Sequence, residues 1–451
     1  MSMRHGTGIG RRKFLERASV TALLGALGGR TPLSAASLER DAQVAGDFDF
    51  DEIYDRSGTD STKWDAARAQ FGPQVEVGMG IADMDFRTAP CITRAVAERC
   101  AHENWGYLTI PDSFIDAIVA WERTRHGVEI DPATVSLHAG VHSALISGYH
   151  AFVPPGSPVL MTTPIYNGFY GSQRFARVVA EESPMVEEGG RYRIDWDDFE
   201  RRIDRCNVFL LCNPQNPTGN CWSATDLMRL GEICLERRVI VFADEIHSDL
   251  VPPGAVHTPF ASLPNRAVVD NSITFRAVSK TFNLPGLKVS WYHSTNPSLL
   301  SRIRAHTRAD FGTLAIVATQ AGLEEGHTWV DRLLPYLGDN QTLAESYITD
   351  NVPLVRYRKA EGTYLAWLDV SGLAERIGAR RTAVEQTSRG TSVVQPEQVV
   401  QRWLAENARI AVSPGHSFGI GGANHMRMNI ATPRALLRRA LENLAEASAR
   451  A

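Results

Sequence analysis

Residues 208–219 read VFLLCNPQNPTG, a short apolar run followed by a turn with two prolines and a glycine. Five consecutive residues without charge are typical of a β-strand that is covered on both faces of its sheet. The prolines and the glycine end the strand and stiffen the turn. In open α/β sheets ligands bind at the carboxyl ends of the strands, so Asn216, which the prolines flank, is a candidate ligand-binding residue.

A second stretch repeats this pattern. Residues 239–247 read VIVFADEIH, an apolar run that ends in two acids and a histidine. Asp244 is its first polar residue, and a carboxylate at this edge can pair with a protonated ring nitrogen. An N-cap is the ordinary alternative for an aspartate here. A metal site with His247 is a weaker alternative, because no third ligand is apparent.

A third stretch places a lysine after a strand. Residues 273–286 read ITFRAVSKTFNLPG, so Lys280 follows Ser279 among small polar residues. A lysine amine at such a position suits covalent chemistry, although a solvated surface lysine is the common alternative. Only five lysines occur among the 47 basic residues of the chain. Because arginine supplies the surface charge, Lys280 stands out as a candidate nucleophile.

The wider pattern predicts an α/β fold. Strand-like runs at 157–162, 208–212, 239–243 and 273–275 alternate with amphipathic segments such as 223–238. This alternation is typical of a mostly parallel sheet with helices on both faces. Near the end of the chain, strand patterns at 361–370 and 409–412 and a helix pattern at 434–449 predict a smaller α+β domain. The polar segment 376–398 resembles a surface insertion.

Composition excludes several classes of protein. The chain has 451 residues, a formal net charge of −4 and 43% hydrophobic residues. This describes a soluble globular protein with two or three domains. A slightly acidic chain offers no electrostatic footprint for nucleic acid. Beyond the N-terminus no run of about 18 apolar residues occurs, so no membrane span is expected.

The first residues resemble an export signal. Residues 10–15 read GRRKFL, an apolar small-residue stretch follows at 18–29, and residues 34–36 read SAA. This order of charged, apolar and small residues is that of a signal peptide, and the paired arginines favour the twin-arginine route. We therefore expect residues 1–36 to be a leader that directs the protein to the periplasm or the exterior. A cytoplasmic location is the alternative.

The order Asn216, Asp244, Lys280, each after a strand, resembles the fold-type-I pyridoxal-phosphate enzymes of the class I/II aminotransferase superfamily. Within it the chain is similar to the PatB/MalY-type cystathionine β-lyases and cysteine C–S lyases. The stretches 81–86 and 363–369 favour this lyase branch. The resemblance is carried by RSGT (56–59), IADMDF (81–86), GY (106–107), NPQNPTG (213–219), DEIH (244–247), SKTFNL (279–284), TYLAWLD (363–369) and PGHSFG (414–419).

The resemblance implies a division of the chain. A large cofactor-binding domain would span residues 86–325, with a mostly parallel sheet sandwiched by helices. Residues 326–451 would form the C-terminal small domain, to which the N-terminal segment 37–85 would contribute.

The resemblance also implies roles around the cofactor ring. Lys280 would bind pyridoxal phosphate covalently through its amine and would then move the proton of the substrate Cα. Asp244 would keep the ring nitrogen protonated, which makes the ring an electron sink. Asn216 would bind the phenolic oxygen, with His247 nearby. Tyr166 would stack on the ring face, although a plain core aromatic is its alternative.

The phosphate would lie at a helix N-terminus. Val141 and His142 begin a helical stretch whose backbone N–H groups would bind the phosphate, and Ser279 would add a contact. The family usually has a hydroxyl three residues before the lysine, but here that residue is Ala277. Lys288 would compensate for the missing contact, with a surface lysine as the alternative.

Three further roles concern the partner subunit and the substrate. Tyr107 would contact the phosphate of a neighbouring subunit, which implies a homodimer with shared active sites. Arg427 would bind the carboxylate of an amino-acid substrate through its guanidinium fork. Asn216 would also contribute to the substrate site.

These roles predict a C–S β-lyase that cleaves L-cystathionine or another L-cysteine S-conjugate to a thiol, pyruvate and ammonia. An aminotransferase that acts on an L-amino acid would use the same residues and is the nearest alternative. A hydrolase that uses Ser417, in GHSFG, lacks the acid and the histidine in the required order. A regulatory protein with a vestigial cofactor site conflicts with the intact set of Lys280, Asp244 and Asn216.

Overall fold

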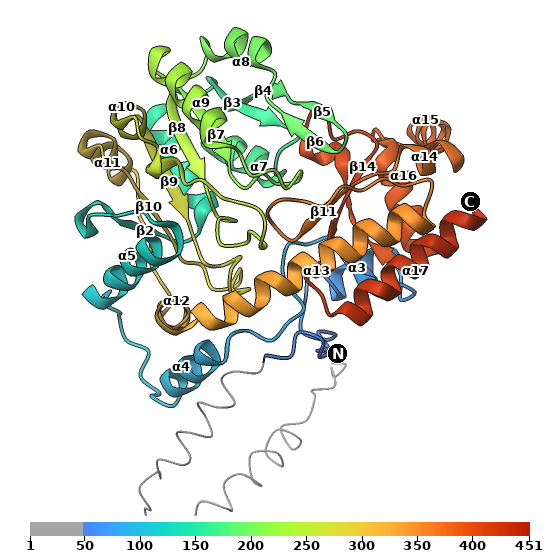
Figure 1. Ribbon diagram of the computed structural model, residues 1–451, viewed down its shortest axis with the longest axis horizontal. Helices are drawn as coiled ribbons and strands as arrows, with labels where there is room; N and C mark the ends of the chain where they lie inside the picture. The colour runs from blue at the N-terminus through green and yellow to red at the C-terminus, as the bar shows by residue number, and fades with distance from the viewer. Residues whose placement is uncertain (1–47) are drawn as a thin grey trace, which may run out of the picture. The chain divides into compact units, whose positions relative to one another are not determined.

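A seven-stranded sheet lies at the centre of the larger part of the fold, with strand order β2-β10-β9-β8-β7-β3-β4 (Figure 1). The computed structural model describes residues 48–451, and residues 49–451 form one compact unit. The leader predicted for residues 1–36 lies outside the described residues. The strands are β2 (Ser136–His138), β3 (Pro158–Thr163), β4 (Val179–Pro184), β7 (Val208–Cys212), β8 (Ile240–Asp244), β9 (Ser272–Arg276) and β10 (Ser290–His293).

The sheet is mostly parallel, as predicted. Strands β4, β3, β7, β8 and β9 run parallel to one another, and β10 is antiparallel to both of its neighbours. All five residues of β7 and of β9 are buried, which is expected for strands covered on both faces. The predicted runs at 157–162, 208–212, 239–243 and 273–275 match β3, β7, β8 and β9 to within two residues.

Helices cover both faces of this sheet. On one face the core contains α6 (Val141–Phe152), α7 (Gly168–Ala176) and α11 (Pro297–Arg304). On the other face it contains α8 (Trp196–Ile203), α9 (Ala224–Glu236) and α10 (Arg266–Asp270). Along the chain, two helices precede β2, namely α4 (Pro90–Cys100) and α5 (Asp112–His126). Two more follow α11, namely α12 (Thr313–Glu325) and α13 (His327–Asn351). A hairpin joins β5 (Val186–Glu188) and β6 (Arg191–Arg193).

A second, smaller sheet is built near the C-terminus. It has three antiparallel strands in the order β11 (Leu365–Asp369), β14 (His425–Asn429) and β13 (Ser413–Pro414). The helices beside it are α14 (Ser371–Arg376), α15 (Ala379–Arg389), α16 (Pro396–Trp403) and α17 (Arg434–Arg450). Within the polar segment 376–398, residues 379–389 form the helix α15, and α16 begins at Pro396. The domain boundaries given above stay a prediction.

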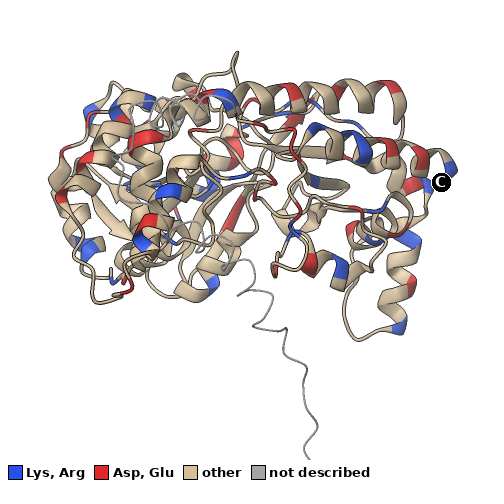
Figure 2. Ribbon diagram, turned by 90° about the horizontal axis from the view of Figure 1, so that it is seen from below, with Lys and Arg blue, Asp and Glu red and all other residues tan. Residues whose placement is uncertain are grey.

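The N-terminal part of the described chain packs on the C-terminal part. Strand β1 (Val77–Gly78) pairs in parallel with β12 (Ile410–Ala411), and Ala67 of α3 (Asp65–Phe71) packs in one cluster with Ala405 and Ala411. This pairing brings the segment after β1 next to β14. Acidic and basic residues are interspersed in the view of Figure 2, in keeping with the net charge of −4. Within residues 48–451, no helix combines the length and the apolar character needed to cross a membrane.

Candidate active site

A cavity of about 310 Å³ opens at the carboxyl ends of β7, β8 and β9. These strands are neighbours, and Cys212 pairs with Asp244 at their ends. The residues that follow the three strands therefore meet at one edge of the sheet. Nine of the residues predicted for the site line the cavity: Val141, His142, Tyr166, Asn216, Asp244, His247, Ser279, Lys280 and Lys288.

The turn after β7 is fixed from several sides. The side-chain amide of Asn213 donates to the Thr258 carbonyl at 3.0 Å. The side-chain amide of Gln215 donates to the Pro164 carbonyl at 3.0 Å. Asn216 is buried between these anchors and lines the cavity. The turn thus places its amide at the edge of the sheet with little freedom to move.

Asp244 is a buried acid without a strong partner of its own. The backbone N–H of Ile246 donates to its Oδ1 at 3.1 Å. Burial raises the pKa of Asp244 to about 7. A cationic partner would favour the ionised form and reverse this rise. The carboxylate therefore fits a group that presents a protonated ring nitrogen.

Lys280 presents its amine to the same cavity. Its Nζ donates to the Ala82 carbonyl oxygen at 2.8 Å. Desolvation and the charge of Arg427 lower the pKa of Lys280 to about 8. A larger fraction of the amine is therefore neutral near physiological pH than for an ordinary lysine. This is the state in which a lysine acts as a nucleophile.

His247 and Tyr166 form aromatic walls. Burial lowers the pKa of His247 well below its usual value, so the imidazole is neutral. Among the described residues its Nδ1 has no hydrogen-bond partner, so a ligand in the cavity could supply one. The ring of Tyr166 packs edge-on against Phe169 and tilted against His142, with centroids 5.4 and 5.5 Å apart respectively. Burial raises the pKa of Tyr166, so its hydroxyl stays protonated.

The opposite end of the cavity suits an anion. Helix α6 begins at Val141, directly after Gly140 with φ 99°, and the first N–H groups of a helix have no partner within it. The Lys288 side chain lies close to this point, since its Cδ is 3.9 Å from where a Cβ of Gly140 would be. A helix N-terminus beside a lysine is a favourable place for a phosphate. Ala277 has no hydroxyl to offer a phosphate; its methyl group packs in the core and does not line the cavity.

Arg427 enters the site from the smaller sheet. It lies on β14, and its guanidinium donates to Asn216 Oδ1 at 3.1 Å and to the Gly80 carbonyl at 3.0 Å. Burial lowers its pKa. Its Nε has no hydrogen-bond partner within the described part of the chain. A buried cation with a free donor is well placed to bind a carboxylate.

Tyr107 lies apart from the cavity of its own chain. Its side chain is fully exposed, between α4 and α5, and Trp105 and Leu108 beside it are also exposed. Its predicted contact with a neighbouring subunit stays a prediction.

Two buried residues that the sequence did not single out contact the segment 80–85, which borders the cavity at Ala82. Tyr364 is fully buried and donates its hydroxyl to the Ala82 carbonyl at 3.0 Å, and its ring lies near that of His247. Lys63 does not line the cavity; it is buried, donates to the Asp83 carbonyl at 3.0 Å and is ion-paired with Asp85 at 2.7 Å. In the sequence, the one feature that sets Lys63 apart is that the chain contains only five lysines.

The fit to pyridoxal phosphate rests on three groups of residues. A nucleophilic amine, a buried acid that lacks a cation, and an anion-binding helix end face one cavity from different sides. Pyridoxal phosphate has a carbonyl, a basic ring nitrogen and a phosphate, which match these three groups in turn. Fold and site together thus define a fold-type-I pyridoxal-phosphate enzyme.

Comparison with known proteins agrees with this class. The family model for aminotransferase class I and II matches residues 75–444. Cystathionine beta-lyase PatB of Bacillus subtilis is 35% identical over 406 residues, which cover 88% of this chain and 99% of that protein. Protein MalY of Escherichia coli is 30% identical over 412 residues, which cover 89% of this chain and 98% of that protein.

A solved structure agrees as well. Cystalysin from Treponema denticola, which contains pyridoxal 5'-phosphate, superposes with a TM-score of 0.80 at 28% identity. The match covers 89% of this chain and 98% of that one. The chain therefore belongs to the class I and II aminotransferase family and, within it, to the PatB/MalY-type C–S lyases. The family and the fold predicted from the sequence are confirmed.

Proposed function

We propose that the protein is a pyridoxal-phosphate-dependent C–S β-lyase. It cleaves L-cystathionine or another L-cysteine S-conjugate to a thiol, pyruvate and ammonia. The observation that carries the proposal is the convergence of Lys280, Asp244 and Asn216 on one cavity, with Arg427 bound to Asn216. The names of the PatB and MalY relatives favour the lyase among the reactions that such a site supports.

The cofactor would be held at three points. Asp244 would pair with the ring nitrogen, and Tyr166 would cover one face of the ring. The N-terminus of α6 and Lys288 would bind the phosphate. When bound, pyridoxal phosphate supplies an electron sink for the Cα of an amino acid.

The chain's own residues would orient the substrate. Arg427 would receive the substrate carboxylate, because its buried charge gains most from an anionic partner. Asn216 holds one side of the guanidinium at 3.1 Å, which limits the direction from which the carboxylate approaches. The side chain of the substrate, with its sulfur on Cβ, would then project away from Arg427.

Lys280 would move the proton. Its amine, with a pKa lowered to about 8, can accept the proton of Cα. The electron pair left at Cα then forms a bond to Cβ, and the C–S bond breaks with the thiolate as leaving group. Water then hydrolyses the remaining three-carbon enamine to pyruvate and ammonia.

The test separates the lyase from an aminotransferase that would use the same residues. Purified protein with cofactor is incubated with cystathionine, with and without a 2-oxo acid. We expect pyruvate and thiol in both mixtures, because elimination needs no amino acceptor. Turnover that depends strictly on the 2-oxo acid would refute the lyase and support the aminotransferase.

We also propose that the enzyme is a homodimer with shared active sites. The exposed aromatic side chains of Trp105 and Tyr107 support this, because a second copy could cover them. The test mixes two inactive variants, Lys280→Ala and Tyr107→Ala, under conditions that allow subunit exchange. Recovery of activity is expected, since one site of each mixed dimer would be intact. Absence of recovery in a confirmed mixed dimer would refute shared sites.

For location, we propose export by the twin-arginine route, because residues 10–36 have the pattern of a twin-arginine signal peptide. Cell fractionation of the full chain and of an Arg11→Lys, Arg12→Lys double variant tests it. The double variant should remain in the cytoplasm. An unchanged distribution would refute the proposal.

A further inference from the structure

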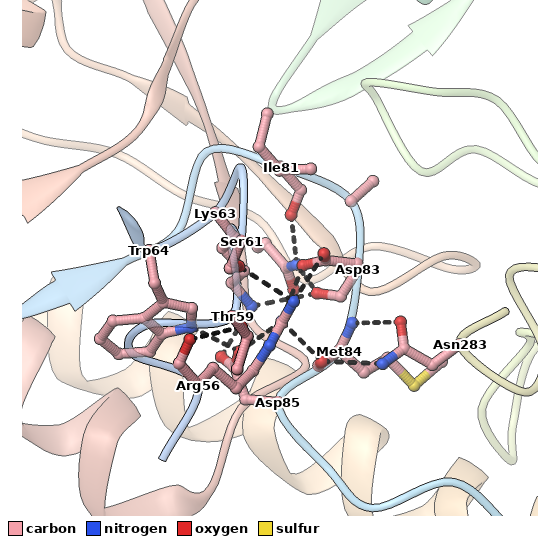
Figure 3. Close-up of polar contacts among 12 residues, drawn as sticks. Arg56, Thr59, Ser61, Lys63, Trp64, Ile81, Asp83, Met84, Asp85 and Asn283 are labelled. Carbon is pink, nitrogen blue, oxygen red and sulfur yellow. Dashed lines mark hydrogen bonds and ion pairs between the residues drawn. The ribbon is translucent and has the colours of Figure 1, made fainter. Parts of the chain in front are cut away.

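Residues 80–85, which we call the bridge, pass over the site between β1 and α4 and read GIADMD. Figure 3 shows the polar side chains that gather on the bridge. Its backbone carbonyls accept hydrogen bonds from several distant parts of the chain. Two of these donors are Lys280 and Arg427, which in the proposed reaction move the proton and bind the substrate carboxylate.

The side of the bridge that faces the site contacts both Lys280 and Arg427. Arg427 donates to the Gly80 carbonyl at 3.0 Å. Lys280 Nζ donates to the Ala82 carbonyl at 2.8 Å, and the Tyr364 hydroxyl donates to the same oxygen at 3.0 Å. One short piece of backbone therefore spans from the proton-transferring amine to the carboxylate-binding guanidinium.

Two asparagines tie the bridge to the segments that carry these residues. Asn283, three residues after Lys280, accepts from the Met84 N–H and donates to the Met84 carbonyl, both at 2.9 Å (Figure 3). Asn429, two residues after Arg427, donates to the carbonyls of Ile81 at 2.6 Å and Asp83 at 2.5 Å. Each reactive side chain is thus fixed to the bridge twice, directly and through its own segment.

An ion cluster holds the other side of the bridge. Arg56 pairs with Asp83 and with Asp85, each at 3.0 Å, and Lys63 pairs with Asp85 at 2.7 Å. The Lys63 and Asp85 side chains are almost completely buried. Lys63 also donates to the Asp83 carbonyl at 3.0 Å, and the Trp64 indole donates to Asp85 at 2.8 Å.

Stability alone does not account for this cluster. Buried ion pairs carry a large desolvation cost, and well-packed apolar residues are often as stable or more so. What such a cluster provides is direction, because charged hydrogen bonds fix both the distance and the orientation of their partners. Here the cluster fixes the backbone of the bridge, which contacts Lys280 and Arg427.

We propose that the bridge is a spacer that sets the position of the Lys280 amine relative to Arg427. Asn283, Asn429, Arg56 and Lys63 are positioning residues that act through it. The proposal rests on the proposed function for the roles of Lys280 and Arg427. The position of the amine itself can be measured without any reaction.

The small number of lysines makes this measurement direct. Full-length protein freed of its cofactor is trace-labelled with acetic anhydride, and the ratio of label on Lys280 to label on Lys359 is read by mass spectrometry. Lys359 donates to Thr342 and does not line the cavity, so it is an internal reference. A loosened bridge should expose the Lys280 amine and raise the ratio.

Asn283→Gly is the first variant. Asn283 has φ 56°, a conformation that glycine adopts readily, so the variant removes both contacts with Met84 without backbone strain. The ratio should rise at least about fivefold, because two hydrogen bonds are lost and each shifts an opening equilibrium by at least about twofold. Asn424→Gly, with φ 60° at a loop outside the cavity, is the matched control and should not change it.

Arg56→Lys tests the ion cluster separately. Arg56 is partly exposed and the variant keeps its charge, so the fold should survive while the fork to Asp83 is lost. The ratio should rise again. Arg202→Lys is the control, because Arg202 on α8 also pairs with two acids, Asp198 and Glu181, but lies away from the cavity and the bridge. A ratio equal to that of wild type in either test variant would overturn the proposal. If wild-type holoenzyme releases no pyruvate from cystathionine, the proposed function fails instead, and the labelling still reports on the bridge.

Discussion

In the protein freed of cofactor, Asp244 is expected to reduce stability. Burial raises its pKa from 3.8 to about 7. A raised pKa in the folded state means that ionisation opposes folding. This cost is absent at pH values below the unfolded pKa and complete above the folded pKa. At about 1.4 kcal/mol per pH unit it reaches at most about 4 kcal/mol at pH 8.

The perturbation is Asp244→Asn. The amide can keep the hydrogen bond from the Ile246 N–H, and it removes the ionisation. Its own N–H groups lack a partner, which offsets about 1–3 kcal/mol of the gain at every pH. The pH dependence is therefore the sharper quantity. Between pH 5 and pH 8 the free energy of unfolding of the variant, relative to wild type, should rise by about 2.5 kcal/mol.

The assay is urea unfolding of both proteins, without cofactor, at several values between pH 5 and pH 8. Asp249→Asn is a control of opposite sign. Burial would raise the pKa of Asp249, but His126, Arg276 and Thr281 lower it below its usual range. That variant should be less stable than wild type by a constant amount between pH 5 and pH 8, because a carboxylate with a lowered pKa keeps its full contribution above its unfolded pKa of 3.8 and loses it only at lower pH. A relative stability of Asp244→Asn that stays flat or falls with rising pH would refute the reasoning.

Two further outcomes are expected. The rate of cofactor uptake, followed by stopped-flow absorbance, should rise with pH with a midpoint near 8, because the neutral Lys280 amine reacts and its pKa is lowered to about 8. Arg427→Met should move this midpoint upward, because the charge of Arg427 helps to lower the pKa of Lys280. A wild-type midpoint near 10 would contradict this. Lys63→Met should reduce the free energy of unfolding by about 3 kcal/mol, because it removes the fully buried one of the two cations that pair with the buried Asp85 carboxylate. Urea unfolding with Lys359→Met as the control checks this, and equal stability of the two variants would argue against it.

The sheet and three site residues could be predicted because their signals are local. An apolar run that ends in a turn is a signal only about ten residues long, and it identifies both a buried strand and the carboxyl end of that strand. Asn216, Asp244 and Lys280 each follow such a run, and parallel strands bring these ends to one edge. In the structure all three residues line one cavity. Their chemical roles await the experiments above.

The bridge could not be predicted in the same way. Its contacts join residues that are distant in sequence, such as Arg427 and Gly80, 347 positions apart. They also involve backbone carbonyls, which every residue has, so no side-chain pattern marks them. Lys63 and Asp85 read as ordinary surface charges until the fold brings them together in the interior.

Tyr107 marks a different boundary. Its assignment depends on a second copy of the chain, and a single chain leaves it exposed. Neither local pattern nor the fold of one subunit tests that assignment, because the interaction that would explain it is intermolecular.

The central claim is that Lys280 serves elimination at the carbon–sulfur bond. The most direct measurement counts thiol and pyruvate released from cystathionine by holoenzyme over many turnovers, in the absence of any 2-oxo acid. Equal amounts of both products from wild type, and neither from Lys280→Ala, are expected. Pyruvate without thiol, thiol without pyruvate, or full activity in Lys280→Ala would contradict the claim.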